Sequence, residues 1–582
     1  MRQTFRGRVP EACRLTGKVG SAMRVLLIEP PVSLYDVPTG TFSIPPPHHL
    51  ERLAGVLRDH HDVRILDLRI EGDVRAELAA FAPRLVGISC VAANSGLAKG
   101  VLREVKRLAP DAVTVMGGHH PSLYPQDCAV AGVDFVVIGE GENTLRELVA
   151  ALESGRDPRT VPGLGYREDG AFRFSPRREL ADLDALPLPD RRLTEKYRRR
   201  RLYYRASWRP VDLCITSRGC PFRCKFCGLW KINQGRFRHR HPERIVEELA
   251  QIQEPYVCFV DDNTLDNVAT ADRLADLIRE RGIRKTFELY GRADTVVRHP
   301  ELVEKWRGVG MKLLLIGLEA CDQPALDALN KRLSVETNRR AIEICHANDV
   351  EIVAYFIVDP GFTREDFQRL AAYVAENNLT HPVFTILSPF PGTDLYEEVK
   401  DHLLTDSFEL IDFYHTVIPP RLPLAEFVIA LGELYEMAGR SEEAQAQYRL
   451  VGAMQALQAD AGVDVDLELA LFDLDHGFDA AGALDRARAA YARRPGLYAA
   501  DVLAWALYHN GSLVEARRYS VEALRLGTRD ALLHFHAGAI ELALGDWAAA
   551  RAHLALALSI NPHFSLRFAP QARAWLDQLS KD

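Results

Sequence analysis

The stretch SRGCPFRCKFCGLW (217–230) decides how this sequence is interpreted. It places Cys220, Cys224 and Cys227 on a loop containing Gly and Pro, directly after the strand-like run DLCITS (212–217). Three thiolates at this spacing suit three corners of a [4Fe–4S] cluster, which leaves the fourth iron open to another ligand. A structural zinc site is disfavoured because it needs four ligands, usually as two separated pairs. Structural thiols are the other alternative.

The region from 211 to 430 repeats a pattern of strand followed by helix. Six apolar runs are each followed by a helix-length segment, and this predicts a partial (βα)6 barrel. The sites of such barrels lie at the carboxyl ends of the strands. The predicted strands are DLCITS (212–217), YVCFVD (256–261), TFELYGR (286–292), LLLIGLE (313–319), EIVAYFIV (351–358) and PVFTILS (382–388).

The region from 23 to 155 also alternates short apolar runs with helix-length segments. Continuous apolar runs of this length are typical of parallel strands covered on both faces, so we expect a Rossmann-like, doubly wound sheet. Several runs end in Gly or a small polar residue, for example Ser89 and Gly139. Ligands of such sheets bind at the carboxyl ends of the strands.

Two segments flank this domain. Residues 1–22 are predicted to be an amino-terminal tail, and Met1 and Met23 are both open as the natural start. Residues 156–210 contain several prolines and are predicted to be a linker. The basic run RRLTEKYRRRRLYYR (191–205) is predicted to be a solvated face of that linker.

The last part of the chain, 431–582, contains no strand-like run and is rich in Ala and Leu. Gly477, Gly511 and Gly545 recur at a step of 34 residues, which is the period of tetratricopeptide helix pairs. We therefore predict stacked helical repeats, and an unrelated helical bundle is the alternative. No metal or cofactor ligand is expected in this region.

Composition narrows the function classes. The 582 residues carry a net charge of −8, from 72 Lys and Arg against 80 Asp and Glu, which disfavours a dedicated nucleic-acid binder. Ten cysteines are too few for a disulfide framework. No stretch approaches the ~18 consecutive apolar residues that a membrane span needs.

The cysteine spacing, with Phe226 just before the third cysteine, resembles the radical S-adenosylmethionine superfamily. The resemblance implies that the open iron chelates S-adenosylmethionine, and that one electron cleaves this molecule to a 5′-deoxyadenosyl radical. It also implies contacts to S-adenosylmethionine at matching positions near the strand ends, although the usual Gly-Gly-Glu motif is missing. Capping of the following helices is the alternative role. The residues so implied are Phe226, Asp261, Asp262, Arg292 and Glu319.

The amino-terminal domain resembles the cobalamin-binding domain of the cobalamin-dependent members of that superfamily. The segments VGISCVAAN (86–94), GGHHPSLYP (117–125) and DFVVIGEGENTLREL (134–148) carry this likeness. The Asp-x-His-x-x-Gly motif is absent, so we expect no protein nitrogen on cobalt. A plain nucleotide-binding or structural domain is the alternative. The implied cobalamin-binding residues are Ser89, Asn94, Gly117, Gly118, His119, Gly139, Glu140 and Gly141.

Within this subgroup the chain most resembles the hopanoid C-3 methylase family. The resemblance implies a methyltransferase that methylates an unactivated carbon of a hopanoid-like lipid or another small molecule, with no catalytic residue beyond the cofactor ligands. Ring closure, ring contraction or another rearrangement is the alternative reaction, and a scaffold without enzymatic activity is the alternative class. Implied partners are an electron donor of the flavodoxin or ferredoxin type and a protein bound by the repeats. A cytoplasmic location is expected, with peripheral membrane contact left open.

Overall fold

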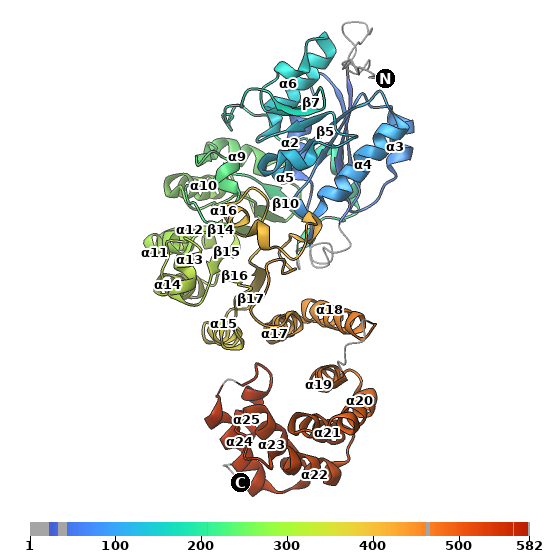
Figure 1. Ribbon diagram of the computed structural model, residues 1–582. Helices are drawn as coiled ribbons and strands as arrows, with labels where there is room; N and C mark the ends of the chain where they lie inside the picture. Colours follow the sequence, from blue (N-terminus) through green and yellow to red (C-terminus); the bar gives the residue numbers. More distant parts are fainter. Residues whose placement is uncertain (1–21, 33–42, 206–207, 461–465, 563, 580–582) are drawn as a thin grey trace, which may run out of the picture. The chain divides into compact units, whose positions relative to one another are not determined.

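The computed structural model describes residues 22–32, 43–205, 208–460, 466–562 and 564–579 (Figure 1). The predicted tail and the choice between Met1 and Met23 fall almost wholly outside these residues. The chain divides into two compact units, which are described separately. Unit 1 comprises 1–360 and 377–419, and unit 2 comprises 361–376 and 420–582.

The first sheet of unit 1 has seven strands in the order β3-β1-β4-β5-β6-β7-β8. The first five of these are parallel, and β7 and β8 are antiparallel additions at one edge. The order reverses beside β1, which is where ligands bind in doubly wound sheets. The strands are β1 (Arg24–Glu29), β3 (Asp62–Asp67), β4 (Leu85–Ser89), β5 (Val113–Gly117), β6 (Phe135–Val137), β7 (Leu164–Glu168) and β8 (Ala171–Phe174).

Helices cover both faces of this sheet. Leu50 of α2 (His48–Gly55) and Leu148 of α6 (Gly141–Ser154) pack on one face with Val25 and Leu27. The opposite face is covered by α3 (Val74–Phe81) and α4 (Ser95–Leu108), which pack on Leu26 and Ile28 of the same strand. Because β1 is buried on both faces, its sequence is a continuous apolar run, as the Rossmann-like prediction requires.

The stretch 156–210 differs from the expected linker. Residues 164–174 form β7 and β8, and Leu164 is fully buried in the core under α6. The short strand β9 (Tyr204–Arg205) pairs with β2 (Ser43–Ile44). The prolines of this stretch lie between these short elements, which is why composition alone indicated a linker.

The basic run within that stretch is a solvated face only in part: Arg192, Arg199 and Arg200 are exposed, but Arg191 and Arg198 point inward and form ion pairs. Arg191 donates to Asp212 at 2.8 Å and to Glu248 at 2.7 Å. Arg198 donates to the carboxylate of Glu51 at 2.7 Å, and all three carboxylate side chains are buried. These ion pairs join the two sheets of unit 1.

The second sheet has six parallel strands in sequential order, β10-β13-β14-β15-β16-β17. They are β10 (Val211–Cys214), β13 (Tyr256–Phe259), β14 (Thr286–Gly291), β15 (Met311–Glu319), β16 (Glu351–Val358) and β17 (His381–Ile386). The connecting helices include α9 (Pro242–Leu249), α10 (Val268–Glu280), α12 (Pro300–Gly308) and α14 (Val335–Ala347). The predicted (βα)6 partial barrel is confirmed.

Unit 2 is all helical among its described residues, as predicted. Its first helix, α15 (Arg364–Glu376), follows β16 in sequence and packs on α17 (Leu424–Met437), where the rings of Phe367 and Phe427 are 5.4 Å apart. The unit boundary therefore precedes the expected one at 430/431, and α15 belongs to unit 2 rather than to the barrel.

The remaining described helices of unit 2 follow one another along the chain. The starts of α21 and α23, Leu497 and Ala531, are 34 residues apart, and so are the starts of α22 and α24, Leu513 and Trp547. The tetratricopeptide assignment stays a prediction. The helices are α18 (Ser441–Asp460), α19 (Asp466–His476), α20 (Ala480–Arg493), α21 (Leu497–His509), α22 (Leu513–Leu524), α23 (Ala531–Leu544), α24 (Trp547–Ile560) and α25 (Phe568–Leu579).

Candidate cofactor site

The segment 217–230, which follows β10 and is called the cysteine loop, carries all three predicted cluster ligands. Cys224 is buried, Cys220 and Cys227 are half-buried, and none of the three forms a disulfide. Burial raises the pKa of each thiol, and it raises the pKa of Cys227 to about 12. Thiols in such surroundings stay protonated until a metal supplies positive charge. The donor set therefore fits an iron–sulfur cluster, with three protein thiolates and one open iron.

Two carboxylates at the end of β13 hold this loop in place. Asp261 accepts hydrogen bonds from the backbone N–H groups of Thr216 at 2.6 Å and Ser217 at 2.9 Å. Asp262 accepts one from the N–H of Gly219 at 2.6 Å. Burial raises the pKa of Asp261 to about 6 against the effect of these hydrogen bonds. Both residues were predicted to contact S-adenosylmethionine, and the structure gives each of them a partner in the loop itself.

Glu319 and Arg292 are buried beside the cysteine loop. Glu319 accepts from the Lys331 ammonium at 2.5 Å, and both groups influence the pKa of Cys224. The guanidinium of Arg292 lies 3.5 Å from the ring centroid of Phe222, which is between the first two cysteines. The structure thus brings two of the predicted S-adenosylmethionine contacts to the loop. Phe226 is half-buried within the loop.

The backbone of Glu319 is unusual. Its φ of 64° is in the left-handed region, where a residue with a Cβ is strained. A Cβ at Gly317 would collide with the Glu319 carboxylate, so the glycine is what allows this carboxylate to reach Lys331. Strained positions of this kind cluster at ligand sites.

A cavity of about 390 Å³ lies between the carboxyl ends of the first sheet and the cysteine loop. On the side of the second sheet, which belongs to the second domain, the lining includes Ser217, Arg218, Val260 and Asp262. The first domain is the part of unit 1 built on the first sheet. Asn94 does not line it and instead accepts a hydrogen bond from the N–H of Val91 at 2.9 Å. The other predicted cobalamin-binding residues all line it: Ser89, Gly117, Gly118, His119, Gly139, Glu140 and Gly141.

The cavity wall fits a large ligand that approaches the backbone closely. Gly139 has a φ of 83°, and a Cβ there would meet no atom within 4 Å. The hydroxyl oxygen of Ser217 is buried without a hydrogen-bond partner among the described residues. Open space at a glycine and an unpaired hydroxyl are what a cobalamin edge with its amide groups would use.

Four histidines of the first 155 residues, His48, His49, His119 and His120, have different surroundings. His119 lines the cavity, and burial lowers its pKa, so its imidazole is neutral at pH 7. His49 also lines the cavity, with Nε2 3.0 Å from a Glu29 carboxylate oxygen. His48 is buried beside Glu51 and does not line the cavity.

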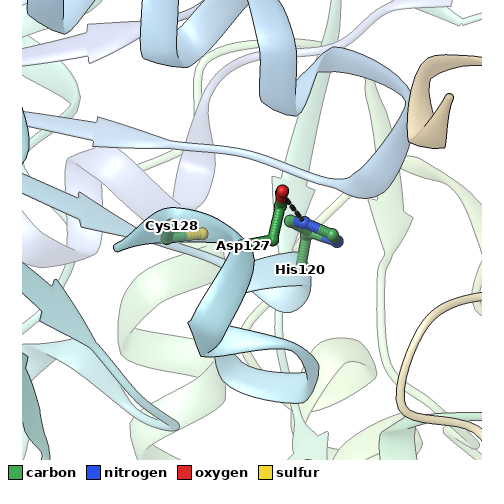
Figure 2. Close-up of side chains that lie close together, drawn as sticks. All are labelled: His120, Asp127 and Cys128. Carbon is green, nitrogen blue, oxygen red and sulfur yellow. Dashed lines mark hydrogen bonds and ion pairs between the residues drawn. The ribbon is translucent and has the colours of Figure 1, made fainter. Parts of the chain in front are cut away.

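His120 lies behind the cavity wall and not in it. Figure 2 shows its ring joined to Asp127, with Cys128 nearby. His120 Nε2 is 2.7 Å from Asp127 Oδ2, and the Lys99 ammonium is 2.5 Å from the same oxygen. Lys99 already neutralises this carboxylate, so the group of His120, Asp127 and Cys128 does not serve as a cation site. The contacts of Asp127 with Lys99 and His120 instead anchor the segment that carries His119.

Arg218 is the main residue that the sequence reasoning missed. It donates to Glu140 at 2.8 Å and also pairs with Glu142, so two carboxylates of the first domain hold the residue next to Gly219. Arg238 and Arg52 complete the group, pairing with Glu140 at 2.8 Å and Glu142 at 3.3 Å. Burial would raise the pKa of Glu140, and the guanidinium groups overcome this and lower it. The sequence signal for this ion pair was the presence of two acidic residues, Glu140 and Glu142, at a predicted strand end, and of an arginine two residues before the first cysteine.

Comparisons with known proteins agree with this geometry. Residues 43–149 match the B12 binding domain, and residues 214–374 match the radical SAM superfamily. A solved structure of the cobalamin-dependent S-adenosylmethionine radical enzyme OxsB, with aqua-cobalamin and S-adenosylmethionine bound, aligns over 96% of this chain and 84% of its own, with a TM-score of 0.54 and 16% identity. The fold and the two domains together define a cobalamin-dependent radical S-adenosylmethionine enzyme.

Relatives narrow this class. The hopanoid C-3 methylase of Methylococcus capsulatus is 31% identical over 413 residues, which is 70% of this chain and 78% of the relative. The anaerobic magnesium-protoporphyrin IX monomethyl ester cyclase of Rubrivivax gelatinosus is 29% identical over 396 residues, 64% of this chain and 70% of the relative. The chain belongs to the cobalamin-dependent radical S-adenosylmethionine methyltransferase family. Its cofactors are cobalamin, a [4Fe–4S] cluster and S-adenosylmethionine, as predicted.

Proposed function

We propose that this enzyme transfers a methyl group to an unactivated carbon of a hopanoid-like lipid or another small molecule. The observation that carries the proposal is the cavity that extends from His119 at the first sheet to Asp262 beside the cysteine loop. A methyl donor held in that cavity would face the loop at which the radical is generated. The 31% sequence identity to a hopanoid C-3 methylase supports a lipid of that class as the substrate.

The residues of the chain have distinct parts in this proposal. When bound, the cofactors supply the methyl group and the radical that removes a hydrogen atom from the substrate. Cys220, Cys224 and Cys227 hold the cluster, and Asp261 and Asp262 fix the loop through its backbone N–H groups.

The polar ends of S-adenosylmethionine would meet the residues beside that loop. Arg292 and the Glu319–Lys331 ion pair are buried there, which keeps water from the reacting carbon. Ser217 and the glycines of the cavity wall would hold the corrin edge.

The test uses the full chain, reconstituted anaerobically with its cluster and cobalamin. We supply S-adenosylmethionine with an isotopically labelled methyl group and lipid extracts from cells that lack the gene. A product that gains one labelled methyl, with S-adenosylhomocysteine and 5′-deoxyadenosine formed in equal amounts, supports the proposal. Substrate conversion without incorporation of the label contradicts it.

Ring closure is the second candidate, and the likeness to the Rubrivivax gelatinosus cyclase favours it. A cyclase would form 5′-deoxyadenosine without S-adenosylhomocysteine, and its product would carry no labelled methyl. The same incubation therefore distinguishes the two reactions.

We also propose a cytoplasmic location, an electron donor of the flavodoxin or ferredoxin type and a protein partner for unit 2. In the described part of the chain no helix is both long and apolar enough to cross a membrane. The apolar helix α17 buries Phe427, Leu431 and Leu434 within unit 2. That helix therefore gives no support to membrane association. Fractionation of cells that express the tagged full chain would test the location.

A further inference from the structure

We propose that three exposed arginines around the cysteine loop form the docking surface for an acidic, low-potential electron-transfer protein. These residues, Arg223, Arg236 and Arg332, are called the basic rim. The inference rests on the proposed function, because it names the place where the required electron donor binds.

The cysteine loop exposes two cations on either side of a buried cysteine. Arg223 and Lys225 are exposed, whereas Cys224 between them is buried. Consecutive Cα atoms are about 3.8 Å apart, so a protein that touches either cation is within one residue of a cluster ligand. An electron carrier at this surface has a short path to the cluster.

Two contacts bring the three arginines together. The Asn330 side chain donates to the carbonyl oxygen of Arg223 at 2.9 Å, which places the turn with Arg332 against the loop. A Cβ at Gly235 would lie 3.9 Å from an Arg223 guanidinium nitrogen, so this guanidinium lies beside Arg236. The basic rim is therefore one surface, although Arg332 is 109 residues from Arg223 in sequence.

The turn that carries Arg332 is held in a costly conformation. Asn330 and Arg332 have φ values of 53° and 55°, in the left-handed region that disfavours residues with a Cβ. This turn sends Lys331 inward to Glu319 and leaves Arg332 exposed. The same strained turn thus places Lys331 at the buried site and Arg332 on the surface.

The basic rim differs in charge from the rest of the chain, which has a net charge of −8. Among the described residues no carboxylate forms an ion pair with Arg223, Arg236 or Arg332, whereas the neighbouring Lys225 pairs with Glu398 at 3.0 Å. Unpaired cations of one sign attract a partner of opposite charge and speed its association. Three cations on an acidic chain fit a small acidic protein better than a nucleic acid, which needs a longer basic surface.

The electron transfer at this surface is simple to balance. The reduced flavin or iron–sulfur centre of the carrier loses one electron, and the cluster passes from the [4Fe–4S]²⁺ to the [4Fe–4S]⁺ state. No bond is made or broken in this step. The electron is then available to cleave S-adenosylmethionine.

The test measures cluster reduction in the full chain, without any substrate. The variant Arg236→Glu/Arg332→Glu leaves the cysteine loop intact, and Arg281→Glu/Arg284→Glu is the matched control. Both control arginines are exposed just before the amino end of β14, whereas the cysteine loop follows the carboxyl end of β10 in the same parallel sheet. Reduced flavodoxin and a reduced [2Fe–2S] ferredoxin are the two protein reductants, and dithionite is the small reductant.

We expect the rim variant to be reduced at least about tenfold more slowly than the natural chain by a protein reductant at low salt. Its rate should also lose most of its dependence on salt. Dithionite should reduce all three proteins at similar rates. Equal rates with both protein reductants for the rim variant and the natural chain would overturn the proposal. Failure of methyl transfer would not, because the readout is the visible absorbance of the cluster.

Discussion

Replacing Arg218 with Gln tests whether the first domain holds the cysteine loop. The substitution leaves Glu140 and Glu142 buried with one guanidinium fewer. Breaking a buried ion pair costs about 3–5 kcal/mol. Each carboxylate keeps a second partner here, Arg238 at 2.8 Å and Arg52 at 3.3 Å, so we expect the lower end, about 3 kcal/mol.

The assay is urea denaturation of the full chain, followed by circular dichroism and by the absorbance of the loaded cluster. Agreement of the two probes shows whether a single transition is being measured. The control is Arg199→Gln, which breaks an exposed ion pair with Glu195 and should cost less than about 0.5 kcal/mol. In the double variant Arg218→Gln/Glu142→Gln the two losses should be less than additive, because each single change already breaks the same Arg218–Glu142 ion pair.

The pH dependence provides an independent check. Burial raises the pKa of Glu142, but Arg218 and Arg52 lower it to well below its usual range. A carboxyl with a depressed pKa in the folded state contributes stability that is present above its ordinary pKa and is lost as the pH falls. The Arg218→Gln variant should therefore lose less stability than the natural chain as the pH falls below 4.5, the usual pKa of a glutamate. A loss below about 1 kcal/mol at neutral pH, or full additivity in the double variant, would refute the role given to Arg218.

Three further predictions use the loaded enzyme. Any single Cys→Ala change in the cysteine loop should abolish iron loading and S-adenosylmethionine cleavage, and a variant that still cleaves would remove the cluster assignment. Single replacement of each histidine near the corrin should leave the cobalt spectrum unchanged, and a shift in any one variant would reveal an overlooked ligand. Truncation after residue 440, which keeps α17 on α15, should preserve the cluster and S-adenosylmethionine cleavage, and a folded, loaded but inactive fragment would show that unit 2 contributes to catalysis. The first two sets are Cys220, Cys224 and Cys227, and His48, His49, His119 and His120.

The predictable part of the fold is local. Strand runs such as RVLLIE (24–29) are continuous because both faces of β1 are covered, and the spacing of three cysteines needs only one loop. Gly477, Gly511 and Gly545 each have a positive φ at a helix end, so their 34-residue step could be identified without tertiary information.

The part that could not be predicted depends on contacts between distant residues. Arg198 and Glu51 are 147 residues apart in sequence, and Arg218 and Glu142 are 76 apart. A run of arginines does not show whether carboxylates from another segment will bury it. Asp261 shows the same limit, because its position at a strand end did not reveal the hydrogen bonds that it accepts from Thr216 and Ser217 after the neighbouring strand.

The cysteine loop is held from two sides, and this links the cofactors. From the second domain, Asp262 binds the N–H of Gly219, and from the first domain, Glu140 and Glu142 bind the side chain of Arg218. All four of these side chains line the cavity proposed for cobalamin or stand beside its wall. A displacement of the cavity wall therefore moves the residue before Cys220, and a displacement of the cluster moves the wall. Both cofactors must act on the same substrate, one by supplying the radical that removes a hydrogen atom and the other by supplying the methyl group. They therefore need a fixed separation, which a shared loop provides with few residues.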